Sequence, residues 1–271
     1  MRKKLTVFGD TWFAQTQIKI PIDSWVSGAI ASPDGSIYLD VLRLWFDRFP
    51  LSSTKDRRAL KARLESLNTS DHLGGVNELS WWEFMRRINL HAEPIRTTNK
   101  PSPDFKVLTP SEFFVEVSTL NVSETEKKRM EEEGVIPLDH AETLRRLLLK
   151  TTNDKKDQIF FATSELRPCV LVLFDYTTWS GFGTQFFRFL ANALFGATFE
   201  FALLPVELSA LVYVEKKVID GRVGISRDRS AIYYNPNAKY PLPFGTFSAL
   251  RQIRCHMTET EPTWPDYWIW L

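Results

Sequence analysis

Two carboxylates are predicted to meet in one β-hairpin. Residues 104–108 and 113–117 have the composition of short strands, and Pro110 breaks the chain between them. Asp104 opens the first strand, and Glu116 lies inside the second, apolar one. Burying a charge is costly unless the charge is paired or bound to a metal. Two carboxylates joined by one hairpin therefore indicate a cation between them.

The second strand of this hairpin has two different faces. Side chains alternate along a strand, so Val115 and Val117 face one side, and Phe114, Glu116 and Ser118 face the other. An ordinary interpretation stays open at this point. A glutamate in a strand often faces solvent, and an aspartate after a proline often begins a turn.

A helix predicted before the hairpin carries a third carboxylate. Residues 76–90 have helical spacing of apolar side chains, with Asn77 as the candidate N-cap and Glu78 in the first turn. A carboxylate there suits the helix dipole. Alternatively, the start of this helix points Glu78 toward the hairpin carboxylates.

A long amphipathic helix is predicted over residues 138–163, after the hairpin. Lys155 falls in the middle of its apolar stripe, and Gln158 points nearly the same way one turn later. A lysine on an apolar face either extends its ammonium group along the surface to water or reaches an acidic cluster. A third helix, over residues 54–67, carries five basic side chains between positions 55 and 63, which indicates either a solvated face or one that contacts phosphates.

Composition narrows the class of protein. The chain has 271 residues, of which 44% are hydrophobic, so it can bury a large core. A net charge of +1 gives no global basic field, so any nucleic-acid binding depends on a local patch. Cys169 and Cys255 are far apart, and the two cysteines and four histidines do not have the spacing of zinc ligands, so neither a disulfide framework nor a zinc site is predicted. No apolar run approaches the ~18 residues of a membrane helix, and no secretory signal is read, so we expect a cytoplasmic protein.

Three segments are predicted along the chain. Residues 1–40 are read as a small β-rich segment, with strands at 5–8, 17–22 and 37–41. Residues 41–245 form the main α/β domain, in which the apolar run 168–176 is a buried central strand. Residues 246–271 form a Trp-rich tail packed on the body or on a partner.

The order of these features resembles the PD-(D/E)XK nuclease superfamily, which has the restriction-endonuclease-like fold. Pro103 and Asp104 match its PD, and Glu116 with position 118 matches its (D/E)XK. More narrowly, the chain is similar to an uncharacterised bacterial family of this fold, through the segments NELSWWEFMRRINL, PDF, FFVEVS and NPNAKYPLP. The resemblance covers residues 40–243 and implies a mixed central β-sheet flanked by helices.

The resemblance also implies a chemistry. Asp104, Glu116 and the backbone carbonyl of Val117 would hold Mg²⁺ or Mn²⁺, with Glu78 as a direct or water-mediated ligand. The protein would be a metal-dependent endonuclease that hydrolyses phosphodiester bonds of nucleic acid, with DNA as the expected substrate, in bacterial defence or repair. Gln158 would position substrate or water. Many such nucleases dimerise, so a homodimer, or a partner bound through the tail, is expected by analogy.

One residue departs from the family pattern. The lysine expected two residues after Glu116 is Ser118, which can hydrogen-bond but cannot replace a cation. In this superfamily a neighbouring helix can supply the lysine, and Lys155 is the candidate. The alternative is a catalytically inactive binding or assembly module of the same fold. A nucleotide hydrolase is a weaker idea, because GFGT at 181–184 does not form a phosphate-binding loop.

Overall fold

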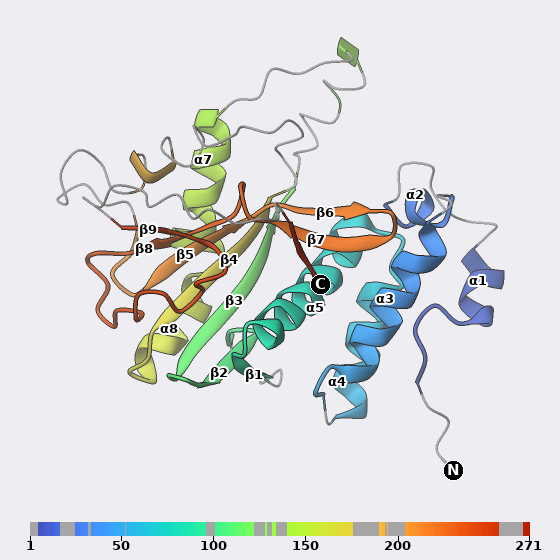
Figure 1. Ribbon diagram of the computed structural model, residues 1–271, viewed down its shortest axis with the longest axis horizontal. Helices are drawn as coiled ribbons and strands as arrows, with labels where there is room; N and C mark the ends of the chain where they lie inside the picture. The colour runs from blue at the N-terminus through green and yellow to red at the C-terminus, as the bar shows by residue number, and fades with distance from the viewer. Residues whose placement is uncertain are drawn as a thin grey trace.

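A seven-stranded mixed sheet is the centre of the molecule (Figure 1). The computed structural model describes residues 5–16, 25–31, 34–51, 53–95, 101–121, 128, 132–133, 140–175, 190–192, 194, 204–254 and 268–271. In spatial order the strands of the sheet are β1 (His91–Pro94), β2 (Phe105–Thr109), β3 (Phe113–Leu120), β4 (Cys169–Asp175), β5 (Ala210–Val214), β8 (Ala231–Tyr234) and β9 (Arg251–Ile253). A mixed α/β architecture is thus confirmed.

Strand direction changes across the sheet. The pairs β1–β2 and β2–β3 are antiparallel, β3–β4 and β4–β5 are parallel, β5–β8 is antiparallel and β8–β9 is parallel. Every residue of β4 is buried, because this strand has parallel neighbours on both sides and helices over its faces. The predicted central strand is therefore confirmed, and so is the hairpin of β2 and β3.

Helices cover both faces of the sheet. On one face α5 (Thr69–Arg87) packs on β3, with α3 (Gly35–Arg48) and α4 (Thr54–Leu64) packed against α5 (Figure 1). On the other face lie α7 (His140–Leu149) and α8 (Lys156–Ser164). The sheet divides the core in two: Val115 and Val117 belong to the α5 side, and Phe114 to the α8 side. None of the described helices has the length and apolar character needed to cross a membrane.

The β-rich reading of residues 1–40 is wrong where the structure describes them. This segment forms α1 (Asp10–Thr16), α2 (Trp25–Ala31) and the start of α3, and residues 5–8 are not in a strand. The predicted strand 37–41 lies inside α3, whose buried side chains recur with a helical period at Tyr38, Leu42 and Trp45. Five residues are too few to distinguish the side-chain period of 2 in a strand from the period of 3.6 in a helix. The predicted strand 17–22 falls outside the described residues.

The C-terminal end packs on the body of the protein. A second sheet consists of β6 (Lys216–Ile219), β7 (Arg222–Ser226) and β10 (Trp268–Trp270), in the order β10-β7-β6. Gly224 of β7 lies beneath both tryptophans of β10, since a Cβ there would be 3.2 Å from the Trp268 ring and 3.3 Å from the Trp270 ring. Residues 255–267 of the tail lie outside the described part of the chain.

A tight turn joins β6 to β7 and fixes this second sheet against α3. Asp220 and Gly221 both have positive φ, 50° and 71°, as a two-residue type I′ hairpin requires. A Cβ at Gly221 would lie 2.5 Å from the Ile37 Cβ and 2.7 Å from the Asp34 carbonyl oxygen. Only glycine therefore fits between the turn and the helix.

We expect Gly221→Ala to lower the free energy of unfolding by about 1–3 kcal/mol, because it combines a strained φ with a backbone clash. The matched control is Gly74→Ala in α5, where a Cβ would meet no atom within 4 Å. That change should be neutral or stabilising by up to about 1 kcal/mol. Urea denaturation of the two variants measures the difference, and equal stability would contradict this account of the turn.

Candidate active site

The candidate site lies where β2 and β3 separate. Their pairing ends at Phe105 opposite Val115, whereas β3 continues to Leu120. Asp104 immediately precedes β2, and its Oδ2 accepts a hydrogen bond of 2.8 Å from the Val117 N–H. The carboxylate thus occupies the place that a continuing strand would take. Since the N–H and C=O of one strand residue point to the same side, the Val117 carbonyl is directed to this edge as well.

Glu116 and Lys155 meet on the α8 side of the sheet. Glu116 is 3% exposed, and its Oε1 lies 2.5 Å from the Lys155 Nζ. The lysine is 39 residues further along the chain, and its side chain is 23% exposed. Of the two interpretations of Lys155, the structure supports contact with an acidic group. Ser118 is also buried on β3, but no hydrogen bond within the described residues joins it to either group.

A π-helical turn places Lys155. The predicted single helix over 138–163 is in fact α7, the π-helix η1 (Lys150–Asp154) and α8. The hydroxyls of Thr151 and Thr152 both donate to the Leu148 carbonyl, and the Lys155 N–H donates to the Lys150 carbonyl at 3.1 Å. Such side-chain competition for helix carbonyls bends and rewinds helices, and π turns are frequent at functional sites. The helical period of 3.6 residues, on which the prediction of one continuous helix depends, is therefore interrupted at residues 150–154.

Glu78 is not in the first turn of its helix, as the sequence suggested. The helix α5 begins at Thr69, and Asn68 is its N-cap, accepting a hydrogen bond from the Asp71 N–H. Asn77, the predicted cap, is buried in mid-helix, where it donates to Thr119 and accepts from Lys216. The first part of the helix, residues 69–76, was not predicted, because its glycines and polar residues leave few apolar side chains to show a helical period.

Glu78 forms an ion pair with Arg63 of α4. Its side chain is only 13% exposed, and that of Arg63 is 44% exposed. Sequence analysis did not single out Arg63. The one signal for it was the run of basic residues in which it lies. Gln158 lies half-buried in the first turn of α8, and no interaction within the described residues joins it to the carboxylates.

Electrostatics couple all five charged groups. Burial, followed by the charge of Asp104, raises the pKa of Glu116 to about 8, although Lys155 lowers it. Burial raises the pKa of Glu78 to about 7 against the opposing effect of Arg63, with Asp104 adding to the rise. Burial also raises the pKa of Asp104, while the Val117 hydrogen bond, Lys155 and Arg63 oppose it. Asp104 is therefore the carboxylate that the others surround.

The donor atoms at this edge suit a hard divalent cation. The second carboxylate oxygen of Glu116, Oε2, is buried without a hydrogen-bond partner among the described residues, which is costly in the absence of a cation. Asp104 and the Val117 carbonyl supply further oxygens, the ligand type that Mg²⁺ and Mn²⁺ prefer. No group of three or more Asp, Glu, His or Cys side chains is arranged as metal ligands in the described part of the chain. A metal would thus be held by two carboxylates, one carbonyl and water.

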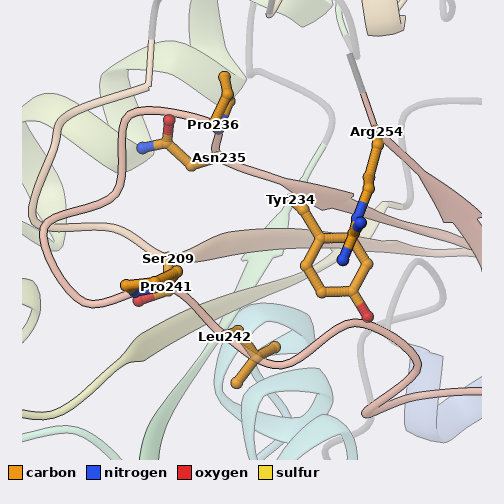
Figure 2. Close-up of a pocket in the computed structure, with 7 residues that line it drawn as sticks. All are labelled: Ser209, Tyr234, Asn235, Pro236, Pro241, Leu242 and Arg254. Carbon is orange, nitrogen blue, oxygen red and sulfur yellow. The ribbon is translucent and has the colours of Figure 1, made fainter. Parts of the chain in front are cut away.

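A separate pocket of about 270 Å³ opens near the β8 end of the sheet (Figure 2). Its lining residues are Ser209, Tyr234, Asn235, Pro236, Pro241, Leu242 and Arg254. The Asn235 amide donates to two backbone carbonyls, and the Ser209 hydroxyl donates to the Tyr240 carbonyl. The Arg254 guanidinium lies 3.8 Å from the centre of the Phe244 ring. Among the described residues that line it, none is an aspartate, glutamate, histidine or cysteine.

In comparisons with known proteins, no family model, no curated protein and no solved structure matches this chain.

The raised pKa of Glu116 predicts a pH-dependent stability. Because the folded state keeps the Glu116 proton up to about pH 8 and the unfolded chain releases it near its ordinary pKa, stability is lost as pH rises through this interval. We expect Glu116→Gln, measured in EDTA, to raise the Tm at pH 8 by on the order of several degrees, with a smaller gain at pH 5.

The control is Glu112→Gln on the same hairpin. Glu112 is exposed and pairs with Arg167 and Lys106, and its pKa is lowered, first by the hydrogen bond from Arg167. This substitution should not raise the Tm at either pH. A Glu116→Gln variant that is less stable than the wild type at pH 8 would contradict the assignment.

Proposed function

We propose that this protein is a metal-dependent nuclease with the restriction-endonuclease-like fold, related to the PD-(D/E)XK superfamily. The observation that carries the proposal is the 2.5 Å contact between the Lys155 Nζ and Glu116. The motif lacks its lysine at position 118. Lys155, at the start of α8 in the connection between β3 and β4, brings a lysine to Glu116 instead. If the ion pair served only stability, Lys155 could pair with any nearby carboxylate. It pairs with Glu116, which is the glutamate of the motif.

The architecture supports the same proposal. A hairpin bearing Asp104 and Glu116 is followed by a helix and by the parallel strand β4, and helices cover both faces of the mixed sheet. In that order, Asp104 lies at the edge of β3 that is not paired with β2 beyond Val115, and Glu116 projects from β3 itself. Fold alone does not establish function, so the residues of the site carry the proposal.

Asp104, Glu116 and the Val117 carbonyl would hold Mg²⁺ or Mn²⁺. When bound, the ion lowers the pKa of a water ligand and stabilises the negative charge that develops on the phosphate. The Val117 N–H fixes the orientation of the Asp104 carboxylate. Oδ2 of Asp104 accepts this hydrogen bond, and Oδ1 would be directed to the cation. The Asp104 carboxylate is therefore oriented before substrate binds.

Lys155 acts as a cation in this scheme. Burial disfavours its charge, but Glu116 and then Asp104 outweigh burial, so its pKa lies above the ordinary value. The ammonium group therefore stays protonated at neutral pH and does not serve as a general base. It orients the attacking water or neutralises charge on the phosphate as the new P–O bond forms and the bond to the leaving oxygen breaks.

The test is cleavage of supercoiled plasmid, linear duplex DNA, single-stranded DNA and RNA in Mg²⁺, Mn²⁺ or EDTA. We expect metal-dependent cutting, most readily of DNA, and a loss on the order of 10²–10³-fold or more in Asp104→Ala, Glu116→Ala and Lys155→Ala. Matched controls are Glu112→Ala on the same hairpin and Lys156→Ala next to Lys155. Both residues are exposed, and both variants should cut like the wild type.

Full metal-dependent cleavage by Asp104→Ala would contradict the nuclease proposal. The competing function, a non-catalytic binding or assembly module, is favoured by Ser118 in the lysine position. It predicts no cleavage of any substrate by the wild type. Calorimetric titration separates the two further, because Mn²⁺ binding that Glu116→Ala abolishes counts against a module that keeps the carboxylates only for structure.

A further inference from the structure

Arg63 lies at the outer side of the carboxylate cluster, on a helix that is not part of the hairpin. One end of its guanidinium donates to Glu78 of α5. Glu78 is nearly buried, whereas 44% of the arginine side chain is exposed. A buried carboxylate thus anchors a side chain that still reaches solvent.

The close crossing of α4 and α5 brings this pair together. Gly75 is one turn before Glu78, and a Cβ there would be 3.2 Å from the Leu64 Cδ2 and 3.4 Å from the Arg63 Cβ. The absence of a side chain at this position lets α4 approach α5 at the point where Arg63 leaves the helix. Both ends of the Arg63 side chain are therefore fixed by packing and by charge.

Most donors of Arg63 are still available. A guanidinium has five N–H donors in a planar fork, and within the described residues Glu78 is its only hydrogen-bond acceptor. Lys155 is less exposed, with 23% of its side chain accessible against 44% for Arg63. Of the two cations that act on Asp104, Arg63 is therefore the more accessible.

Arg63 places a positive charge beside the carboxylates that would hold the cation. Its charge acts on Asp104 as well as on Glu78. A phosphodiester carries one negative charge, so a guanidinium next to a divalent cation gives a backbone phosphate a complementary neighbour.

We propose that Arg63 forms a phosphate-binding subsite beside the metal site, donating to non-bridging oxygens of the nucleic-acid backbone. Glu78 is then the positioning residue that holds Arg63, and it is not a metal ligand. This inference rests on the proposed nuclease function and deepens it: the contact is to the backbone, so it is independent of base sequence. Guanidinium groups bind phosphate through paired N–H donors, which a lysine does not reproduce.

The experiment measures binding of a fluorescein-labelled DNA duplex by anisotropy, in Mn²⁺ and at several salt concentrations, and steady-state cleavage of the same duplex. For Arg63→Gln we expect Kd to rise by on the order of tenfold and the slope of log K against log[salt] to fall in magnitude by about 0.9. Arg63→Lys should keep the salt slope and lose part of the affinity. Arg58→Gln, exposed on the same helix and without an ion pair to the three carboxylates among the described residues, should change neither quantity.

Glu78→Gln tests the positioning role and the metal assignment together. We expect KM for the duplex to rise while Mn²⁺ affinity, measured by calorimetry in the absence of DNA, stays within about twofold. A loss of Mn²⁺ binding in Glu78→Gln would overturn the assignment, because it would make Glu78 a ligand. A purely structural ion pair would lower the Tm of Arg63→Gln without altering the salt slope.

The outcomes separate the two proposals. If the wild type cuts and Arg63→Gln binds DNA with an unchanged salt slope, the phosphate subsite is wrong and the nuclease stands. If the wild type neither cuts nor binds any nucleic acid with Mn²⁺, the nuclease proposal fails and the subsite with it. Where Arg63→Gln does not fold, as judged by circular dichroism, the loss of affinity in Arg63→Lys and the rise of KM in Glu78→Gln test the subsite, and wild-type values in both variants would overturn it.

Discussion

The hydrogen bond from the Val117 N–H to the Asp104 carboxylate is the contact on which the rest of the site depends. It forms because β2 stops pairing with β3 after Val115, so the backbone of β3 needs another partner at that edge. A side chain supplies this partner where a strand would otherwise continue. The use of a side chain in place of a strand also brings the charge of Asp104 close enough to act on Glu116.

Burial makes this arrangement costly for folding. Three carboxylates lie where desolvation favours their neutral forms, and the two cations beside them offset only part of that effect. One oxygen of Glu116 is buried without a partner among the described residues. Strained or unsatisfied groups of this kind persist where function requires them, at the expense of stability. A hydrophobic replacement would suit the core better and would remove the chemistry.

Lys155 and Arg63 approach the site from opposite faces of the sheet, and a different structural feature positions each of them. Lys155 is positioned by a π turn in which two threonine hydroxyls compete for one helix carbonyl. Arg63 is positioned by the close approach of α4 to α5 at Gly75. The side chains of β3 alternate between the same two faces, with Val115 on the α5 side and Phe114 on the α8 side. Asp104, at the edge itself, interacts with both cations.

The sequence by itself determined the features that depend on neighbours along the chain. The hairpin of β2 and β3, the opposite faces of Phe114 and Val115, and the buried strand β4 all follow from alternation and continuous hydrophobicity, which are local. Lys155 was identified as an inward-facing side chain even though its helix is interrupted, because the apolar stripe is carried by residues on both sides of the π turn.

Only the tertiary structure decided the rest. The segment 37–41 follows a turn signal and has the composition of a strand, but it is helical. Its buried side chains, Tyr38 and Leu39, continue into Leu42 and Trp45, so the helical period becomes clear only with the residues that follow. Arg63 and Glu78 are 15 positions apart on two helices, and nothing in their spacing specifies that the helices cross there. The positions of charged groups on separate elements depend on packing between those elements, which local sequence patterns do not encode.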